Sequence, residues 1–379
     1  MAEQPIGSLS EYFSQLEDPR IERNKLHSLL NIIVIAICAV ICGAENWVDV
    51  ELYGNLKEEW LKQYLDLSNG IPSHDTFGRV FRRLKAEGFQ ACFLAWVKAV
   101  NELTQGQVIA IDGKELRRSM DGSLGKRAIH MVSAWANENR LVLAQQKVDE
   151  KSNEITAIPA LLEMLEIAGC IITIDAMGCQ KEIAQQITDQ RGDYVLAVKE
   201  NQGHLFEDIQ HLCQLYRQHE QPMFYFNDYA KTVDKAHDRI EIRECWTLSA
   251  SFYGPNIRNL ADWAQVKTLV MIRRERQLPD KTETHTRYYI SSLEGKAERF
   301  LKVIREHWGI ENSVHWVLDM AFNEDQSRLH KDNGAENLAV IRHIALNLLR
   351  NEKTAKVGIK AKRLKAGWDD AYLFKVLSS

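Results

Sequence analysis

The pattern of apolar and polar residues predicts that the chain begins with helices. Residues 29–44 carry no charge and are strongly apolar. These 16 residues are fewer than the ~20 that a membrane-spanning helix needs, and the polar residues before them do not resemble a signal peptide. We therefore predict a buried helix over 29–44 within a helical amino-terminal domain that covers residues 1–100.

A second helical stretch begins after Ser73, a residue type that commonly caps helices. The apolar positions of this stretch are spaced as on one helix face: Phe77, Val80, Phe81 and Leu84. Its basic positions fall mostly on the other side: Arg79, Arg82, Arg83 and Lys85. The arrangement is compatible with a helix-turn-helix-like DNA-binding module and equally with an ordinary amphipathic helix whose basic face is solvated.

The middle of the chain alternates between strand and helix patterns. The predicted order is β-β-β-α-β-α-β, with strands at 108–112, 128–136, 141–148, 171–175 and 193–199 and helices at 154–169 and 181–190. Three antiparallel strands followed by alternating helices and parallel strands are typical of a ribonuclease H-like domain. We therefore predict an α/β fold with a ribonuclease H-like core.

Two of the predicted strands end on an acid. Asp112 closes one buried strand and Asp175 closes another. Ligands of open α/β sheets bind at the carboxyl ends of strands, and carboxylate oxygens are ligands that Mg²⁺ prefers. The pattern predicts a hard-cation site, although an Asp-Gly pair such as Asp112–Gly113 also commonly opens a plain turn.

A third acid is expected from a helix that packs on this sheet. The stretch 203–292 has mixed helical and strand character, and a helical pattern then resumes. In that helix His307, Glu311 and His315 follow one another at intervals of four residues and so share one face. A helical zinc site is the alternative for these three residues, but the HExxH motif is absent.

Composition limits the classes of partner and compartment. The formal charge of −4 means that no overall positive field attracts nucleic acid, so any DNA must be bound by local basic patches. The seven cysteines are odd in number and form no CxxC pair, which argues against a disulfide framework and favours a reducing cytoplasm.

Basic residues occur in two places that suit DNA contacts. Lys114, Arg117 and Arg118 directly follow Asp112. The segment 350–365 is also strongly basic and includes Lys362 and Arg363, although such a run is often only a solvated surface. Trp246 is a candidate for stacking on an extruded base, with a core position as the alternative.

The chain also resembles a known family across nearly its whole length. The motifs that carry the resemblance are IAIDGK, EKSNEITAIPALLEML, TIDAMGCQKEIA, GDYVLAVKENQG, RYYISS and REHWGIENSVHWVLDMAFNEDQSR. Together they are similar to the DDE transposases of insertion sequences, specifically the H-repeat-associated group. The resemblance implies a catalytic and metal-binding triad of Asp112, Asp175 and Glu311. It further implies a core formed by 101–202 and 293–350, interrupted by a β-rich insertion at 203–292, with 351–379 as a basic carboxyl-terminal segment.

The sequence departs from the broader relatives around Glu311. Those relatives have tyrosine seven residues before this acid, arginine four before and lysine seven after, where this chain has Ile304, His307 and Leu318. The H-repeat group has the HW, IEN, HW and NED pattern seen here. We assign Arg305, His307 and Asn312 to DNA contacts or to orienting the phosphate or Glu311.

The resemblance implies metal-dependent cleavage of DNA at insertion-sequence ends followed by strand transfer. It implies two Mg²⁺ or Mn²⁺ ions per site, double-stranded DNA as element ends and target, and a homodimer in the DNA complex. The short apolar run and the cysteines described above predict no membrane association and a cytoplasmic location. Two alternatives stay open: a two-metal nuclease without strand transfer, and a DNA-binding remnant that has lost catalysis.

Overall fold

A computed structural model describes residues 7–22, 25–100, 103–119, 128–148, 152–217, 226–236 and 239–379. The amino-terminal part is helical, as predicted. Its helices are α1 (Gly7–Phe13), α2 (Leu29–Ile41), α3 (Trp47–Leu56), α4 (Glu58–Leu61), α5 (His74–Arg83) and α6 (Ala86–Val100).

The apolar stretch forms the buried helix that its composition predicts. Nearly every side chain of α2 is buried, and Ser28 caps the helix by accepting a hydrogen bond from the backbone of Asn31. Helix α5 buries Phe77, Val80 and Phe81. Ser73 stands at the predicted cap of α5, but its hydroxyl contacts that of Thr76 and does not bond the helix backbone.

One nine-stranded sheet runs through the rest of the molecule, in the order β3-β2-β1-β4-β5-β9-β8-β7-β6. Its strands are β1 (Val108–Leu116), β2 (Ile129–Ala136), β3 (Leu141–Lys147), β4 (Ile171–Ile174), β5 (Asp193–Val198), β6 (Asp228–Ala236), β7 (Arg239–Ser249), β8 (Thr268–Gln277) and β9 (Thr282–Ser291). Strands β1, β4 and β5 are parallel, and β2 and β3 pair antiparallel beside β1.

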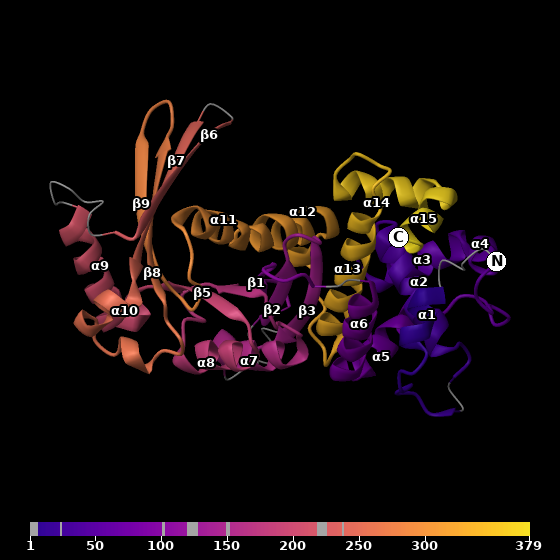
Figure 1. The fold of residues 1–379 in the computed structure, drawn as a ribbon. Coiled ribbons are helices and arrows are strands. Elements are labelled where there is room, and N and C mark those ends of the chain that lie inside the picture. The colour runs from indigo at the N-terminus through magenta and orange to yellow at the C-terminus, as the bar shows by residue number, and fades with distance from the viewer. Residues whose placement is uncertain are drawn as a thin grey trace.

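The strands of 203–292 extend the central sheet. Strand β9 pairs antiparallel with β5, so β9, β8, β7 and β6 continue the layer that β1, β4 and β5 begin. In Figure 1 these strands rise at the end of the molecule opposite to the two termini. The sequence predicted strands over β7, β8 and β9, whereas β6 was not predicted.

Helices cover both faces of the sheet. The helices α7 (Glu154–Met164) and α8 (Lys181–Asp189) lie on one face, and α11 (Ala297–His307) lies on the other (Figure 1). The predicted helix over 154–169 is therefore too long, because the chain leaves the helix at Leu165. Helix α9 (Gly203–Arg217) and the single-turn helix α10 (Ala250–Tyr253) accompany the strands β6–β9.

The carboxyl-terminal helices pack against the amino-terminal ones. They are α12 (Trp316–Phe322), α13 (Gly334–Asn351), α14 (Ile359–Trp368) and α15 (Asp370–Leu377). Helix α13 contacts α2, α5 and α6 as well as β3, and so joins the sheet to the helical end of the molecule (Figure 1). None of the helices within the described ranges is long and apolar enough to span a membrane.

Candidate active site

Asp112 and Asp175 are neighbours because β1 and β4 are parallel and in register. Ile111 pairs with Ile174, the last residue of β4, so each aspartate is the next residue along its chain. The strand that contains Asp112 does not end there as predicted. It continues to Leu116 because β2 is long enough to pair with it, down to Ile129. Asp112 therefore lies where β1 extends beyond its parallel partner.

A tight turn fixes Asp175. Its Oδ1 accepts hydrogen bonds from the backbone N–H groups of Met177 at 3.0 Å and Gly178 at 3.4 Å. A Cβ on Gly178 would lie 2.3 Å from the Ile174 side chain, so only glycine allows the turn to pack this closely on the strand. These bonds hold one carboxyl oxygen at the turn and fix the orientation of the other.

Glu311 comes from a π-helical segment between α11 and α12. The sequence predicted one continuous helix, but residues Glu311–His315 form π-helix. A π-helical turn inside a helix is rare and occurs frequently at functional sites. The side chain of His315 nevertheless approaches the aspartates, with its Nδ1 3.5 Å from Asp112 Oδ2.

The three acids line one cavity of about 740 Å³. Asp112, Asp175 and Glu311 share this cavity with Lys199 and Arg287. His307 lines it too, and its Nδ1 lies 3.0 Å from the hydroxyl oxygen of Thr173 on β4. Burial lowers the pKa of His307 to about 4, so this imidazole is neutral at physiological pH.

The three acids lie in surroundings that raise their pKa values. Burial, followed by the charges of Asp175, Glu154 and Glu311, raises the pKa of Asp112 to about 7. Burial and then the charge of Glu154 raise the pKa of Asp175, while Lys199 opposes the shift. Burial also raises the pKa of Glu311, against the effect of Arg287. Crowded carboxylates of this kind are characteristic of sites that bind a cation or share a proton.

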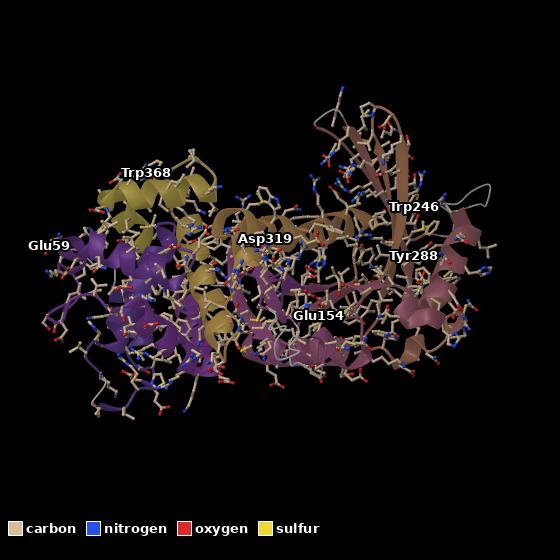
Figure 2. The ribbon with its side chains drawn as sticks, turned by 180° about the vertical axis from the view of Figure 1, so that it is seen from behind. Glu59, Glu154, Trp246, Tyr288, Asp319 and Trp368 are labelled. Carbon is tan, nitrogen blue, oxygen red and sulfur yellow. The ribbon has the colours of Figure 1, made fainter. Side chains whose placement is uncertain are left out.

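Glu154 is a fourth acid at the site, which the sequence reasoning missed. It begins α7, and its Oε1 lies 2.6 Å from His130 Nε2 on β2. A Cβ on Gly113 would lie 2.1 Å from Glu154 Oε1 and 2.4 Å from His130 Nε2, so the glycine after Asp112 makes room for this pair. Figure 2 shows Glu154 in the central part of the molecule. Its position in EKSNEI, at the start of a helix after three strands, was the available signal.

The donor set suits a hard divalent cation. Three carboxyl groups face one cavity, and oxygen ligands are those that Mg²⁺ and Mn²⁺ prefer. Across the described ranges, however, no three His, Cys, Asp or Glu side chains form a ready-made metal cluster. The zinc alternative of His307, Glu311 and His315 gains no support from the geometry, because His307 Nδ1 lies 3.0 Å from Thr173 and His315 Nδ1 lies 3.5 Å from Asp112, so the two imidazoles contact different residues of the sheet.

The predicted DNA contacts after Asp112 differ in exposure. Lys114 is nearly buried and pairs with Asp319, and its Nζ lies 2.8 Å from Glu324 Oε2, so this ammonium group is already neutralised. The prediction that Lys114 contacts DNA is therefore wrong for this conformation. Arg117 and Arg118 are exposed, although Arg117 Nε lies 3.4 Å from Asp325.

Lys362 and Arg363 are also buried, which corrects a second prediction. Arg363 donates hydrogen bonds to the carbonyl oxygens of Val40, Ala44 and Ala321. Lys362 donates to the carbonyls of Leu349 and Glu352. These side chains hold chain segments together, because unpaired carbonyls at helix ends need donors. They are not available to phosphates.

Other predicted contacts lie at the surface or in the core. Arg305 and Asn312 are exposed and both line a second cavity that adjoins the active-site cavity. Trp246 is buried against Tyr229, with ring centroids 5.2 Å apart, so the core alternative is confirmed for this residue (Figure 2). Of the basic residues on the predicted amphipathic helix, Arg82 pairs with Asp332 and Lys85 with Glu17.

Two models of known protein families match this chain. A model described as "Transposase DDE domain" matches residues 103–348, which include Asp112, Asp175 and Glu311. A second model, described as "DDE_Tnp_1-associated", matches residues 10–97, the helical amino-terminal part. The class that fold and site define is that of the transposases with a DDE domain.

Similar curated proteins show to which group of these transposases the chain belongs. The chain is 42% identical to "Putative transposase YncI" of Escherichia coli O157:H7, over 99% of this chain and 95% of that one. It is 43% identical to "H repeat-associated putative transposase YhhI" of Escherichia coli K12, over 98% of each. A short relative, "Inactive transposase YbfQ" of the same strain, is 47% identical over 20% of this chain and 89% of its own length. The chain belongs to the H-repeat-associated DDE transposases.

Proposed function

We propose that this transposase cleaves DNA strands at the ends of an insertion sequence and joins the freed 3′ ends to target DNA. The observation that carries the proposal is the meeting of Asp112, Asp175 and Glu311 in one cavity, although they are far apart in the chain. Burial and then the charges of neighbouring acids raise the pKa of Asp112 to about 7, which supports a site suited to positive charge.

The fold supports a ribonuclease H-like core. The strand order is β3-β2-β1-β4-β5, and it contains the three antiparallel strands followed by parallel strands that the sequence predicted for such a core. We propose that this core comprises 101–202 and 293–350, with 203–292 inserted, 1–100 serving DNA binding or assembly, and 351–379 as the carboxyl-terminal segment.

In this proposal the three acids hold the metal ions and the surrounding residues position the DNA. Asp112, Asp175 and Glu311 would bind two Mg²⁺ or Mn²⁺ ions, which when bound stabilise charge on the attacking and leaving oxygens of a phosphoryl transfer. The turn at Met177 and Gly178 orients Asp175, and neutral His307 fixes the helix that carries Glu311 against Thr173. Lys199 and Arg287 add positive charge where the scissile phosphate would lie.

The partners of the reaction follow from the same proposal. The DNA would be the double-stranded element ends and the target, held by two copies of the chain in a cytoplasmic complex. Light scattering of the protein with and without end DNA measures that stoichiometry. A complex that contains only one copy of the chain would contradict the dimer, whereas the cleavage assay tests the chemistry separately.

A cleavage and joining assay tests the function. Purified protein is mixed with a labelled duplex that carries the element ends, with and without Mg²⁺ or Mn²⁺. We expect metal-dependent cleavage and joined products, and no cleavage with Asp175→Ala. The matched control is Asp189→Ala, an exposed acid at the end of α8.

The outcomes separate the alternatives. Cleavage without joined products would indicate a nuclease. Binding without any cleavage would indicate an inactive remnant, and the relative named as an inactive transposase makes this outcome worth testing.

A further inference from the structure

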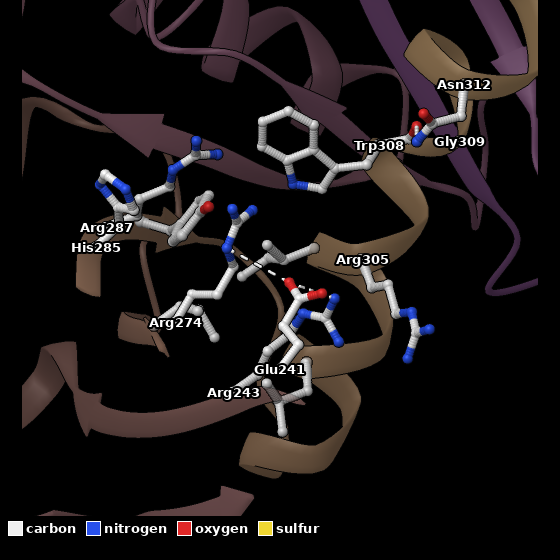
Figure 3. Close-up of a pocket in the computed structure, with 13 residues that line it drawn as sticks. Glu241, Arg243, Arg274, His285, Arg287, Arg305, Trp308, Gly309 and Asn312 are labelled. Atoms are coloured by element: carbon white, nitrogen blue, oxygen red, sulfur yellow. Dashed lines mark hydrogen bonds and ion pairs between the residues drawn. The ribbon is translucent and has the colours of Figure 1, made fainter. Parts of the chain in front are cut away.

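A second cavity lies directly beside the candidate active site. It has a volume of about 490 Å³ and lies between the strands β7–β9 and helix α11 (Figure 3). Five residues line both cavities: His285, Arg287, Tyr289, Ile304 and Trp308. A ligand in the second cavity would therefore be next to any group bound at Glu311.

The second cavity is rich in arginine. Four arginines line it, each from a different element, and we call the cavity the arginine pocket: Arg243 on β7, Arg274 on β8, Arg287 on β9 and Arg305 on α11. Glu241 is the acidic residue among its lining residues, so the pocket has a surplus of positive charge (Figure 3). This local charge contrasts with the net charge of −4 of the whole chain.

Acidic residues beside the pocket hold two of the arginines in place. Arg243 pairs with Asp234 and with Glu241, both at 2.7 Å. Asp234 also lies 2.9 Å from Arg305. Such pairs fix the direction of the planar guanidinium groups, which lowers the entropy lost when they bind a ligand.

The other two arginines have N–H groups that can still bind a ligand. Arg274 Nε forms an ion pair with Glu241 at 3.4 Å, but this buried N–H makes no hydrogen bond in the described structure. Arg287 pairs with no carboxylate in the described part of the chain. Its guanidinium lies over the ring of Trp308, 4.5 Å from the centroid. A guanidinium that lacks an acidic partner next to a cavity is well suited to a phosphate.

We propose that the arginine pocket binds backbone phosphates of the DNA strand that passes through the active site, with Arg287 connecting the two cavities. This inference rests on the proposed function, since it assumes that DNA is the substrate. The pocket has the size of a small-ligand site, so it accommodates one or two phosphodiester groups of a single strand and not a duplex. Arginine forks match phosphate oxygens in geometry as well as charge.

Binding without metal tests the proposal. Fluorescence anisotropy measures the Kd for a labelled element-end duplex with a single-stranded extension, over a range of KCl concentrations and without divalent ions. We expect Arg287→Ala and Arg305→Ala each to weaken binding about tenfold. Each should also lower the slope of log Kd against log salt by about 0.7–0.9, the loss of one phosphate contact.

The matched control is Arg299→Ala. Arg299 is exposed on the same helix as Arg305 but does not line the pocket, so its removal should leave the Kd and the salt slope unchanged. The side chain of Arg305 is 58% exposed, so Arg305→Ala should not disturb folding. This variant therefore tests the proposal even if Arg287→Ala lowers the thermal stability.

Two results would overturn the proposal. One is an unchanged salt slope in both pocket variants. The other is that the pocket variants bind inorganic phosphate more weakly than wild type does but bind DNA with an unchanged Kd. That result would assign the pocket to small anions. Because the assay contains no metal, wild-type protein that binds DNA but never cleaves it would overturn the proposed function and leave the pocket result standing.

Discussion

Asp112 differs from an ordinary surface aspartate because its charge is unfavourable in the folded protein. Burial and three neighbouring acids raise its pKa to about 7, against 3.8 for a free side chain. A raised pKa in the folded state means that the folded protein binds the proton more tightly than the unfolded chain does. The contribution of Asp112 to stability is therefore greatest below about pH 4 and is lost as the pH rises through about 7.

The substitution Asp112→Asn should remove the pH dependence of stability that Asp112 causes. Without metal at pH 8, we expect the variant to be more stable than wild type by about 1–3 kcal/mol, because the neutral amide escapes the repulsion. Urea unfolding at pH 5 and pH 8 measures the effect, and the gain should shrink at pH 5. An equal stability difference at both pH values would show that charge is not the cause.

Glu154 provides a second test at the scale of single residues. Its charge raises the pKa of both Asp112 and Asp175, so Glu154→Gln should lower both pKa values. The affinity for Mn²⁺, measured by electron paramagnetic resonance, should fall in wild type as the pH drops through about 7, and in the variant at a lower pH.

Glu163→Gln is the control for this experiment. Glu163 lies on the same helix but is exposed, so its variant should behave as wild type. If Glu154→Gln did not change the pH at which the affinity for Mn²⁺ falls, the His130–Glu154 pair would have only a structural role.

At the scale of elements, helix α13 completes the edge of the sheet. Strand β3 is an edge strand, and the buried side chain of Asn347 bonds both backbone groups of Val142 at 2.9 Å. An asparagine on a helix thus takes the place of a neighbouring strand. This contact protects an edge that would otherwise present unpaired donors and acceptors.

Asn347→Leu should therefore destabilise the protein. Both groups of Val142 would be left buried without partners, at a cost of about 2–4 kcal/mol. Chemical denaturation measures this cost, with Asn351→Ala at the end of the same helix as control. If Asn347→Leu lowered the free energy of unfolding by less than the control does, water would have replaced the amide as the partner of Val142.

The elements that local pattern determines were predictable from sequence, and those that depend on packing were not. Asp112 and Asp175 were found because each follows an apolar run. Glu154 was missed because its role arises only where α7 meets β1 and β2. The π-helical turn at Glu311 was missed because the apolar positions around it still fit a regular helix. Burial of Arg363 depends on carbonyl groups from distant segments, and burial of Lys362 depends on the way α14 packs beside the end of α13, neither of which a local pattern reveals.

At the scale of the whole molecule, α14 joins the two ends of the chain. Arg363 on this helix bonds carbonyls at the end of α2 and at Ala321 on α12, while its guanidinium lies 4.2 Å from the ring centroid of Phe322. One side chain thus connects the amino-terminal helices, the helix that follows Glu311 and the carboxyl terminus. Its loss should loosen the support of the active site from a distance.

Two variants distinguish this structural role from DNA binding. Arg363→Met removes the buried donors and should lower the free energy of unfolding by about 3 kcal/mol or more, since several carbonyls lose their partner. The salt slope of DNA binding should not change.

The double variant Lys356→Ala/Lys360→Ala alters exposed positions of the same basic segment and should leave stability unchanged. If the segment contacts DNA, it is this second variant that lowers the salt slope, because only exposed cations release counterions from phosphates. A stable Arg363→Met protein with weakened DNA binding would reverse these assignments and place Arg363 at the DNA surface.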